Sequence, residues 1–228
     1  MNNQRRVLGI VPARGGSKRL PRKNILPLNG VPLISYTIHA GLASQAIDEV
    51  VVSSDHDEIL NIATSLGAKP LLRPDSLASD TATTFAVVEH VLGHYGGYDA
   101  VVLLQPTSPL RRADHIDEAM ALFNQKGADA VISVCEMDHS PLWSNRLDSS
   151  LSMKGFLREE VLNKRSQDLD PYYRLNGAIY IVNADRLLEE QSFLLKDNSF
   201  AYIMDRWDSV DIDEAIDFEI ASLLLQKR

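Results

Sequence analysis

The sequence has little of what several protein classes require. Its 228 residues include a single cysteine, Cys135, so no disulfide can form within the chain and a reducing compartment is expected. No apolar run is long enough to cross a membrane, and the run at residues 7–11 is too short for a signal peptide. We therefore expect a cytoplasmic protein without a membrane partner.

Positive charge is also scarce overall. The chain has 23 lysine and arginine residues against 31 aspartate and glutamate residues, a formal net charge of -8 at pH 7. A nucleic-acid surface needs basic side chains spread over one face, so this balance argues against nucleic acid as a partner. The length and a hydrophobic content of 45% allow a real core.

Short β-branched runs alternate with amphipathic stretches along most of the chain. Strands are expected at residues 7–11, 50–53, 69–72, 101–104, 130–134, 178–182 and 201–204. Helices are expected at residues 32–43, 57–66, 83–92, 113–123, 184–190 and 214–225. This alternation predicts an α/β fold with a mostly parallel, twisted sheet flanked by helices on both faces. Ligands bind such sheets at the carboxyl ends of the strands.

One segment interrupts the alternation. Residues 136–175, called the arm below, are polar and contain Pro141, Pro171 and the pair Tyr172-Tyr173. A long irregular segment in a compact domain usually has a function or a partner. We therefore expect a single domain over residues 1–228, with the arm as an insertion.

The positive charge that the chain does carry is concentrated after the first expected strand. The segment VPARGGSKRLPRKN, residues 11–24, is called the basic loop below, and it carries Arg14, Lys18, Arg19, Arg22 and Lys23 around Gly15-Gly16. Adjacent glycines allow a tight turn with exposed N–H groups, and the cations suit a polyphosphate. The spacing matches neither a P-loop nor a dinucleotide fingerprint. A solvated basic surface is the alternative interpretation.

A pair of carboxylates lies near the other end of the chain. In DSVDID, residues 208–213, Asp211 and Asp213 are two positions apart, so both point to one side of an extended backbone. Such an acidic pair can bind Mg²⁺ together with substrate phosphates. The alternative is that Asp213 caps the last helix.

Together these segments resemble the acylneuraminate cytidylyltransferases, the CMP-sialic acid synthetases. The resemblance rests on the basic loop and, in the same order, on VVSSD (51–55), LRPDSLASDTATT (72–84), LLQPTSPLR (103–111), LNGAIYI (175–181) and DSVDID (208–213). It covers nearly the whole chain. The resemblance implies a Rossmann-like nucleotidyltransferase fold with the arm as a protruding dimerisation element, and therefore a homodimer. It also implies transfer of CMP from CTP to the anomeric hydroxyl of a sialic-type nonulosonic acid, with Mg²⁺ as cofactor, for surface polysaccharide biosynthesis.

The resemblance also assigns roles to individual residues. Catalysis falls to Arg14, Lys23 and Asp211, and metal binding to Asp211 and Asp213. Nucleotide binding falls to Arg14, Gly15, Lys18, Lys23, Asn24, Arg73, Asp80, Thr81 and Thr84. Sugar binding falls to Gln105, Arg165 and Tyr180, although Tyr180 could equally be an ordinary strand residue. The base is either Asp211 or a metal-bound hydroxide.

Two departures from related patterns bear on the sugar. The related Kdo cytidylyltransferases carry a proline where this chain has Asn24, which favours the acylneuraminate branch. Sialic-acid-specific members often carry a lysine where this chain has Trp143, and an apolar side chain suits a more hydrophobic acid such as legionaminic acid. Sialic acid is the first expectation, with legionaminic, pseudaminic or Kdo acid as alternatives. The alternative of another class is a non-catalytic nucleotide-binding protein.

Overall fold

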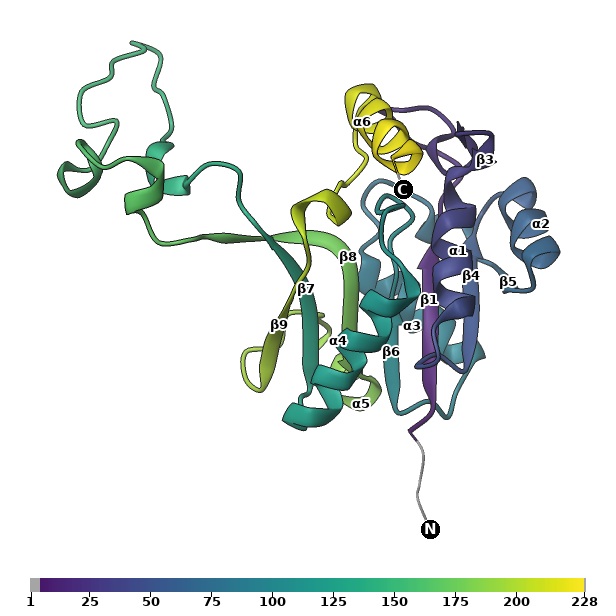
Figure 1. Ribbon diagram of the computed structural model, residues 1–228. Helices are drawn as coiled ribbons and strands as arrows, with labels where there is room; N and C mark the ends of the chain where they lie inside the picture. Colours follow the sequence, from purple (N-terminus) through teal and green to yellow (C-terminus); the bar gives the residue numbers. More distant parts are fainter. Residues whose placement is uncertain (1–4, 228) are drawn as a thin grey trace.

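A seven-stranded sheet in the order β5-β4-β1-β6-β8-β7-β9 forms the centre of the computed structural model, which describes residues 5–227 (Figure 1). The strands are β1 (Val7–Pro12), β4 (Glu49–Ser54), β5 (Lys69–Leu72), β6 (Ala100–Leu103), β7 (Ala130–Glu136), β8 (Tyr173–Asn183) and β9 (Ser199–Ile203). All seven expected strands are confirmed. Residues 1–4 and 228 of the expected single domain lie outside the described part of the chain.

The sheet is mostly parallel, as expected, and a single antiparallel strand makes it mixed. Four neighbouring pairs are parallel, but β8 runs antiparallel to both β6 and β7. Strands that are joined at the same end of a sheet pair antiparallel, whereas a parallel pair needs a crossover to the opposite end. The arm connects β7 to β8 at one end, so β8 returns in the opposite direction.

Six helices lie where the periodicity predicts them. They are α1 (Leu33–Ala43), α2 (Asp57–Leu66), α3 (Thr84–His94), α4 (Ala113–Lys126), α5 (Ala184–Glu190) and α6 (Ala215–Gln226). Gly67 and Gly127 end α2 and α4 in the left-handed conformation, with φ of 91° and 55°. Thr83 begins α3 by accepting a hydrogen bond from the Ala86 N–H at 3.1 Å.

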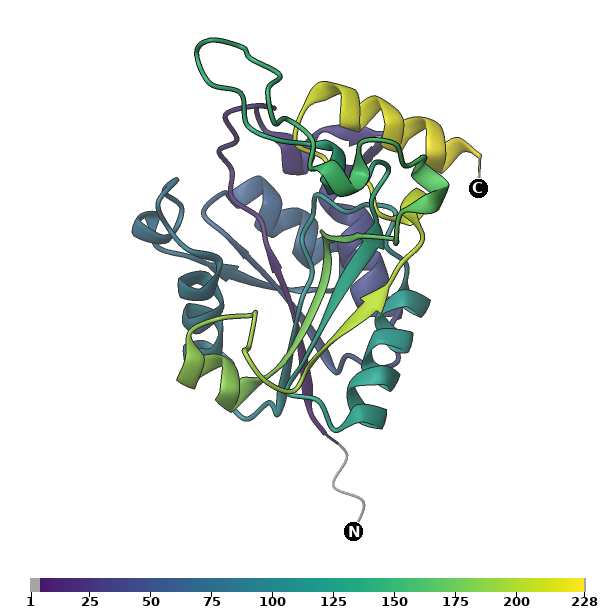
Figure 2. The same cartoon turned by 90° about the vertical axis from the view of Figure 1, so that its left-hand side faces the viewer.

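Helices cover both faces of the sheet, as expected (Figure 2). On one face α1, α2 and α4 bury Ile38, Ile59 and Phe123. On the other face α3 and α5 bury Val88 and Leu187. Because helices cover both faces, the side chains of the inner strands are mostly buried and apolar. Polar loops therefore lie at the ends of the strands, including the carboxyl edge.

The C-terminal helix α6 packs away from the sheet, above its carboxyl edge (Figure 1). It lies against a short hairpin, β2 (Pro27–Leu28) and β3 (Val31–Pro32), in a cluster of Leu28, Leu33, Ile212 and Ala221. The hairpin was missed by the periodicity, although its turn, Asn29-Gly30, has positive φ at both residues and is a strong hairpin signal. This cluster brings the C-terminal segment to the basic loop.

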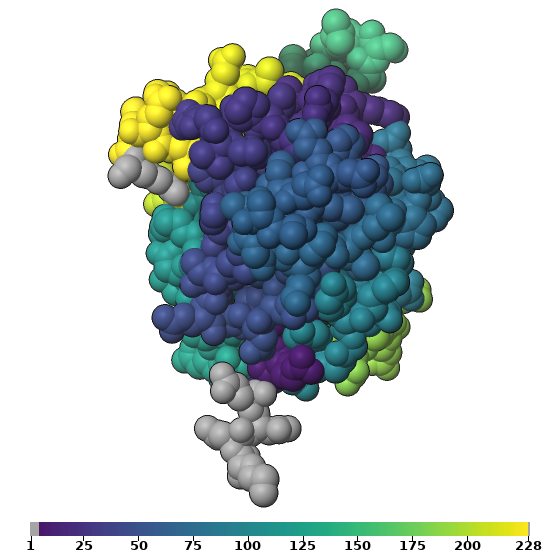
Figure 3. Space-filling model, turned by 90° about the vertical axis from the view of Figure 1, so that its right-hand side faces the viewer, coloured from purple at the N-terminus to yellow at the C-terminus, as the bar shows by residue number. Residues whose placement is uncertain are grey.

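The arm projects from the body of the molecule (Figures 1 and 3). Strands β7 and β8 extend into its two ends, where Glu136 pairs with Tyr173, so the part outside the sheet is residues 137–172. That part contains only three short 3-10 helices: Pro141–Trp143, Glu159–Val161 and Ser166–Asp168. Within residues 5–227, no helix combines the length and the apolar character needed to cross a membrane.

Candidate active site

A cavity of about 330 Å³ opens at the carboxyl edge of the sheet. Three segments line it: the basic loop after β1, residues 73–87 after β5, and residues 105–107 after β6. The predicted site residues along its wall are Arg14, Lys23, Asn24, Arg73, Asp80, Thr84 and Gln105. Such an edge is where open α/β sheets bind ligands.

Buried contacts hold the basic loop in place. Asn24 is buried, and its side-chain amide donates to the Arg14 carbonyl at 2.9 Å. The Gly15 N–H donates to Asp55 Oδ1 at 2.9 Å, while Gly16 and Ser17 line the cavity. Asp55 directly follows β4 and was not among the predicted site residues, because its role depends on a contact across forty positions of sequence.

The five cations of the basic loop all face carboxylates. Arg14 and Lys18 contact Asp80 at 2.8 and 2.6 Å. Hydrogen bonds from Lys18 and Arg14 lower the pKa of Asp80. The remaining pairs are Arg19 with Asp213 at 3.0 Å, Lys23 with Asp213 at 3.6 Å, and Arg22 with Glu58. Like charges can therefore crowd on one loop because other segments supply the opposite charge.

Arg73 is buried beside the cavity. Its Nη2 lies 3.8 Å from Asp55 Oδ1, and its Nη1 donates to the Leu77 carbonyl at 3.4 Å. Burial lowers the pKa of this guanidinium, which Asp55 partly offsets. Its Nε has no hydrogen-bond partner among the described residues. A buried donor of this kind at a cavity wall favours binding of a polar ligand.

The acidic pair lies on an extended segment on either side of Ile212, which is fully buried. Burial raises the pKa of Asp211, the charge of Asp213 adds to this, and a hydrogen bond from the Thr107 side chain opposes it. Helix α6 is capped by Asp217, which accepts from the N–H groups of Asp213 and Glu214 at 3.0 and 2.8 Å. Asp213 is thus free of the capping role that was its alternative interpretation.

The donor chemistry of the acidic pair fits Mg²⁺. Both side chains offer hard oxygen ligands, and the raised pKa of Asp211 reflects buried negative charge that a cation would relieve. Within residues 5–227, no group of three or more histidine, cysteine, aspartate or glutamate side chains could hold a metal ion. Further oxygen ligands would have to come from substrate phosphates and water, which is common for Mg²⁺.

Gly177 leaves open a space that the side chains of Gln105 and Asp211 both approach. Its φ is +74°, and a Cβ at this position would lie 2.9 Å from Gln105 Oε1 and 3.5 Å from Asp211 Oδ2. The register of β7 and β8 shifts beside it, between Ile132 and Val134. Gly177 was not predicted as a site residue, although Asn-Gly within a strand pattern can indicate a bulge.

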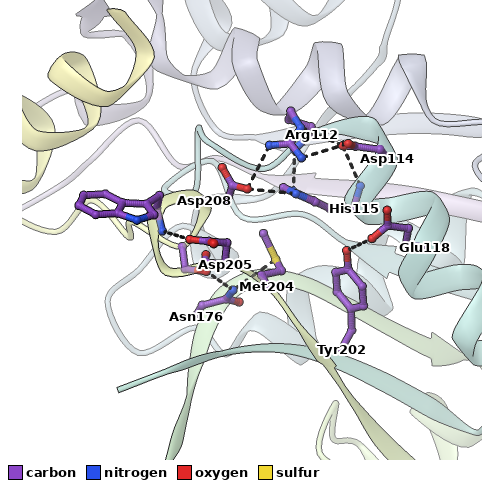
Figure 4. Close-up of polar contacts among 11 residues, drawn as sticks. Arg112, Asp114, His115, Glu118, Asn176, Tyr202, Met204, Asp205 and Asp208 are labelled. Atoms are coloured by element: carbon purple, nitrogen blue, oxygen red, sulfur yellow. Dashed lines mark hydrogen bonds and ion pairs between the residues drawn. The ribbon is translucent and has the colours of Figure 1, made fainter. Parts of the chain in front are cut away.

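A buried polar network anchors the segment that leads to the acidic pair (Figure 4). The Ser133 hydroxyl donates to Asn176 Oδ1 at 2.6 Å, and Asn176 Nδ2 donates to Ser209 Oγ at 2.9 Å. Asp208 contacts Arg112 Nη1 at 3.0 Å and His115 Nε2 at 3.3 Å. Fully satisfied buried networks fix one arrangement of the backbone.

Arg111 ties the loop after β6 to β8. It is fully buried, and its Nη1 donates to the carbonyls of Gln105, Ser108 and Ala178 at 3.3, 3.4 and 3.5 Å. Burial lowers its pKa to about 9. The sequence could not have assigned it this role, because the contacts join segments about seventy positions apart.

Several predicted site residues, including Asp211 and Asp213, lie outside the cavity wall. Gly15, Lys18 and Thr81 are in the segments that form the cavity but are not among its lining residues. Tyr180 packs edge-on against Phe193 with ring centroids 5.9 Å apart, so its ring contributes to the core of one face. Arg165 lies on the projecting arm and pairs with Asp168 at 3.1 Å. Thr107, which was not predicted, lines the cavity.

The fold and this edge define a nucleotidyltransferase-like protein of the Rossmann type. The chain matches the model of the family described as cytidylyltransferase over residues 8–228, and it belongs to that family. Its resemblance to the acylneuraminate cytidylyltransferases is thereby confirmed.

Three relatives carry the names of three sugar acids. The chain is 38% identical over 224 residues to an N-acylneuraminate cytidylyltransferase of Escherichia coli, covering 98% of this chain and 53% of that protein. It is 36% identical over 232 residues to the CMP-N,N'-diacetyllegionaminic acid synthase of Legionella pneumophila, covering 97% of each. It is 37% identical over 222 residues to a pseudaminic acid cytidylyltransferase of Campylobacter jejuni, covering 95% of each. The chain thus spans about half the length of the first relative.

Solved structures agree with the fold. A CMP:2-keto-3-deoxy-manno-octonic acid synthetase complexed with CTP superposes with a TM-score of 0.74 at 17% identity, covering 97% of this chain and 99% of that one. A 4-diphosphocytidyl-2C-methyl-D-erythritol synthase from Anaerococcus prevotii superposes with a TM-score of 0.69 at 12% identity, covering 98% and 97%.

The contact between the basic loop and His56 predicts that the two adjacent glycines differ in tolerance. A Cβ at Gly15 would lie 2.8 Å from His56 Cδ2 and 2.9 Å from His56 Cβ, whereas a Cβ at Gly16 would meet nothing within 4 Å. We expect Gly15→Ala to lower the free energy of unfolding by about 1–3 kcal/mol through overpacking, and Gly16→Ala to change it by less than about 0.5 kcal/mol. Urea denaturation of both variants measures this. Equal losses would show that His56 does not restrict the loop.

The close approach over Gly177 predicts a loss of activity beyond backbone strain. Gly177→Ala places a methyl group against Gln105, while the matched variant Gly67→Ala has a similar φ, +91°, and meets nothing within 4 Å. Both should lose about 1–2 kcal/mol of stability. Only Gly177→Ala should also lower the rate of the reaction proposed below, by about tenfold or more. Equal activity in the two folded variants would contradict the importance of this contact.

Proposed function

We propose that the protein transfers CMP from CTP to the anomeric hydroxyl of a nonulosonic acid and releases pyrophosphate. The observation that carries the proposal is the contact between the two ends of the chain. Lys23 Nζ donates to the Ile212 carbonyl at 2.5 Å and lies 3.6 Å from Asp213. Cations for the phosphates and carboxylates for a metal therefore meet at one edge of a cytidylyltransferase fold.

The reaction forms a bond between the sugar oxygen and the α-phosphorus and breaks the bond between that phosphorus and the oxygen bridging to the β-phosphorus. Arg14, Lys18 and Lys23 would hold the phosphate oxygens and offset the charge that develops on the leaving pyrophosphate. The proton of the sugar hydroxyl has to reach a base. Asp211 would take this role through a carboxylate oxygen that does not hold the cation.

Asp211 and Asp213 would hold Mg²⁺, which would supply charge neutralisation on the phosphates. This role explains why a negatively charged pair lies beside a phosphate site. Without a cation, the carboxylates would repel the nucleotide. Lys23 and Arg19 provide part of that positive charge in the protein itself.

The substrates would lie on either side of the α-phosphate. Asn24, Arg73, Thr81 and Thr84 would surround the nucleoside, and Gln105 the sugar acid. The relatives named for N-acylneuraminate, legionaminate and pseudaminate are within two percentage points of identity to this chain, so identity does not select the acid. We keep sialic acid as the first candidate and legionaminic acid, favoured by Trp143, as the second.

The arm suggests a homodimer. Seven of its large apolar side chains are exposed in the single chain: Leu147, Leu151, Met153, Leu162, Tyr172, Tyr173 and Leu175. A second copy that covers them would remove this apolar area from water. The arm projects from the body of the molecule (Figure 1), and Arg165, one of its residues, would then serve the partner's site by binding the sugar carboxylate. A cytoplasmic location and a role in surface polysaccharide biosynthesis complete the proposal.

Pyrophosphate release tests the reaction and the acid together. With CTP and Mg²⁺, we expect turnover with N-acetylneuraminate above that with legionaminate, pseudaminate and Kdo. Asp211→Asn should lower kcat by about a hundredfold or more, because both the base and a metal ligand are lost. Faster turnover with legionaminate would assign that acid. Full activity of the Asp211→Asn variant would contradict the proposed mechanism. No turnover with any acid would contradict the proposed function.

The role of Arg165 predicts a separation of the two substrates. Arg165→Ala should raise KM for the sugar acid about tenfold or more and leave KM for CTP unchanged, because the lost contact is to the acid alone. Arg158→Ala is the matched control, since Arg158 lies on the same arm, is 73% exposed against 75% for Arg165, and also pairs with a nearby carboxylate. Equal changes in both KM values would count against this role.

A further inference from the structure

The carboxylate of Asp80 forms ion pairs with two cations, Arg14 and Lys18, that a phosphate chain would also need. Its two oxygens are taken by two different side chains of the basic loop, Oδ1 by Arg14 Nη1 at 2.8 Å and Oδ2 by Lys18 Nζ at 2.6 Å. Arg14 and Asp80 both line the cavity. These are the distances at which a phosphate oxygen would lie from the same nitrogens.

Asp80 contributes little to the fold of its own segment. It lies in the loop between the 3-10 helix Asp75–Leu77 and α3, which is held by local bonds such as the Ala82 N–H to the Ser79 carbonyl at 3.3 Å. The side chain of Asp80 is 47% exposed, and both of its ion-pair partners belong to the basic loop. The carboxylate can therefore rotate toward water without any rearrangement of the backbone.

A bound phosphate chain and this carboxylate cannot both keep full contact with the two cations. Each phosphate oxygen at Arg14 or Lys18 would share N–H donors with Asp80 and would repel it as a like charge. A triphosphate or pyrophosphate carries several negative charges and can displace a single carboxylate. A weakly charged ligand gains less from the same cations and displaces it less readily.

We infer that Asp80 competes with the phosphate chain for Arg14 and Lys18. This competition determines which anions can bind the basic loop. Asp80 neutralises Arg14 and Lys18 in the free protein, yields them to a strongly charged chain, and retakes them as pyrophosphate leaves. The inference deepens the proposed function, on which its link to CTP rests. The resemblance implies that Asp80 contacts the nucleoside and so favours nucleotide binding. The inference gives Asp80 the opposite effect, because its carboxylate weakens binding of the phosphates.

The two roles predict opposite effects of Asp80→Asn, a substitution that preserves shape and removes the charge. Isothermal titration without divalent cations and at low ionic strength would compare pyrophosphate, CTP and cytidine. We expect the variant to bind pyrophosphate and CTP about tenfold more tightly, because two exposed ion pairs no longer have to be broken. Cytidine, which lacks phosphates, should bind unchanged. An unchanged or weaker affinity for pyrophosphate would overturn the inference.

Glu58→Gln provides the matched control. Glu58 pairs with Arg22 of the same loop, is similarly exposed, and lies outside the cavity wall. The Glu58→Gln substitution also removes one negative charge. If the effect depends on where the carboxylate lies, this variant should change pyrophosphate binding by less than about twofold. An increase equal to that of Asp80→Asn would reduce the effect to net charge and overturn the inference.

The outcomes also separate this inference from the proposed function. Tighter pyrophosphate binding by Asp80→Asn, in a protein that gives no turnover with any sugar acid, would support the competitor role and remove the proposed reaction. Turnover with a sugar acid but no change in pyrophosphate affinity would support the proposed reaction and overturn the competitor role. Inhibition of turnover by pyrophosphate should strengthen in the variant by the same factor as the binding.

Discussion

Repulsion among five cations within ten positions of the basic loop is the constraint around which the site is organised. The structure relieves it with carboxylates from three separate segments: Glu58 on α2, Asp80 before α3 and Asp213 before α6. Exposed ion pairs of this kind contribute little individually, typically about 0–1 kcal/mol. The burial of Leu28, Leu33 and Ile212 is therefore what holds the C-terminal segment in place, and the charges determine which side chains face each other.

The direction of β8 determines what else reaches this edge. Because β8 runs antiparallel to β6, it begins at the edge where the parallel strands end, and Asn176 and Gly177 lie there rather than at the opposite end. Arg111 then joins the loop after β6 to β8, and the missing side chain of Gly177 leaves room for Gln105 beside Asp211. A parallel β8 would have placed these residues away from the basic loop. The arm, as the connection that reverses the chain, is thus part of how the site is built.

The sequence predicted most of what depends on local pattern. Gly67 and Gly127 end their helices through local backbone conformation, so neighbouring residues alone predict these ends. The composition of the basic loop likewise predicts its positive charge. Tertiary contacts decided the rest. The direction of β8 depends on where the arm returns, and Asp55, Arg111 and Thr107 matter only because the fold brings distant segments to them. For Asp213, the local sequence allowed a helix cap as well as a metal ligand, and Asp217, in the first turn of α6, takes the capping role.

The carboxylates of the site differ in how firmly they are held, and this difference follows from burial. Asp211 follows a segment fixed by Ser209 and Asn176, lies next to buried Ile212, and accepts a hydrogen bond from Thr107. Moving it would break several buried contacts, so its position is set before any ligand arrives. Asp80 is exposed and held only by ion pairs with two flexible side chains, so it can leave at low cost. In the proposed function, Asp211 therefore positions charge before the ligand arrives, and Asp80 exchanges its cations when the phosphate chain binds.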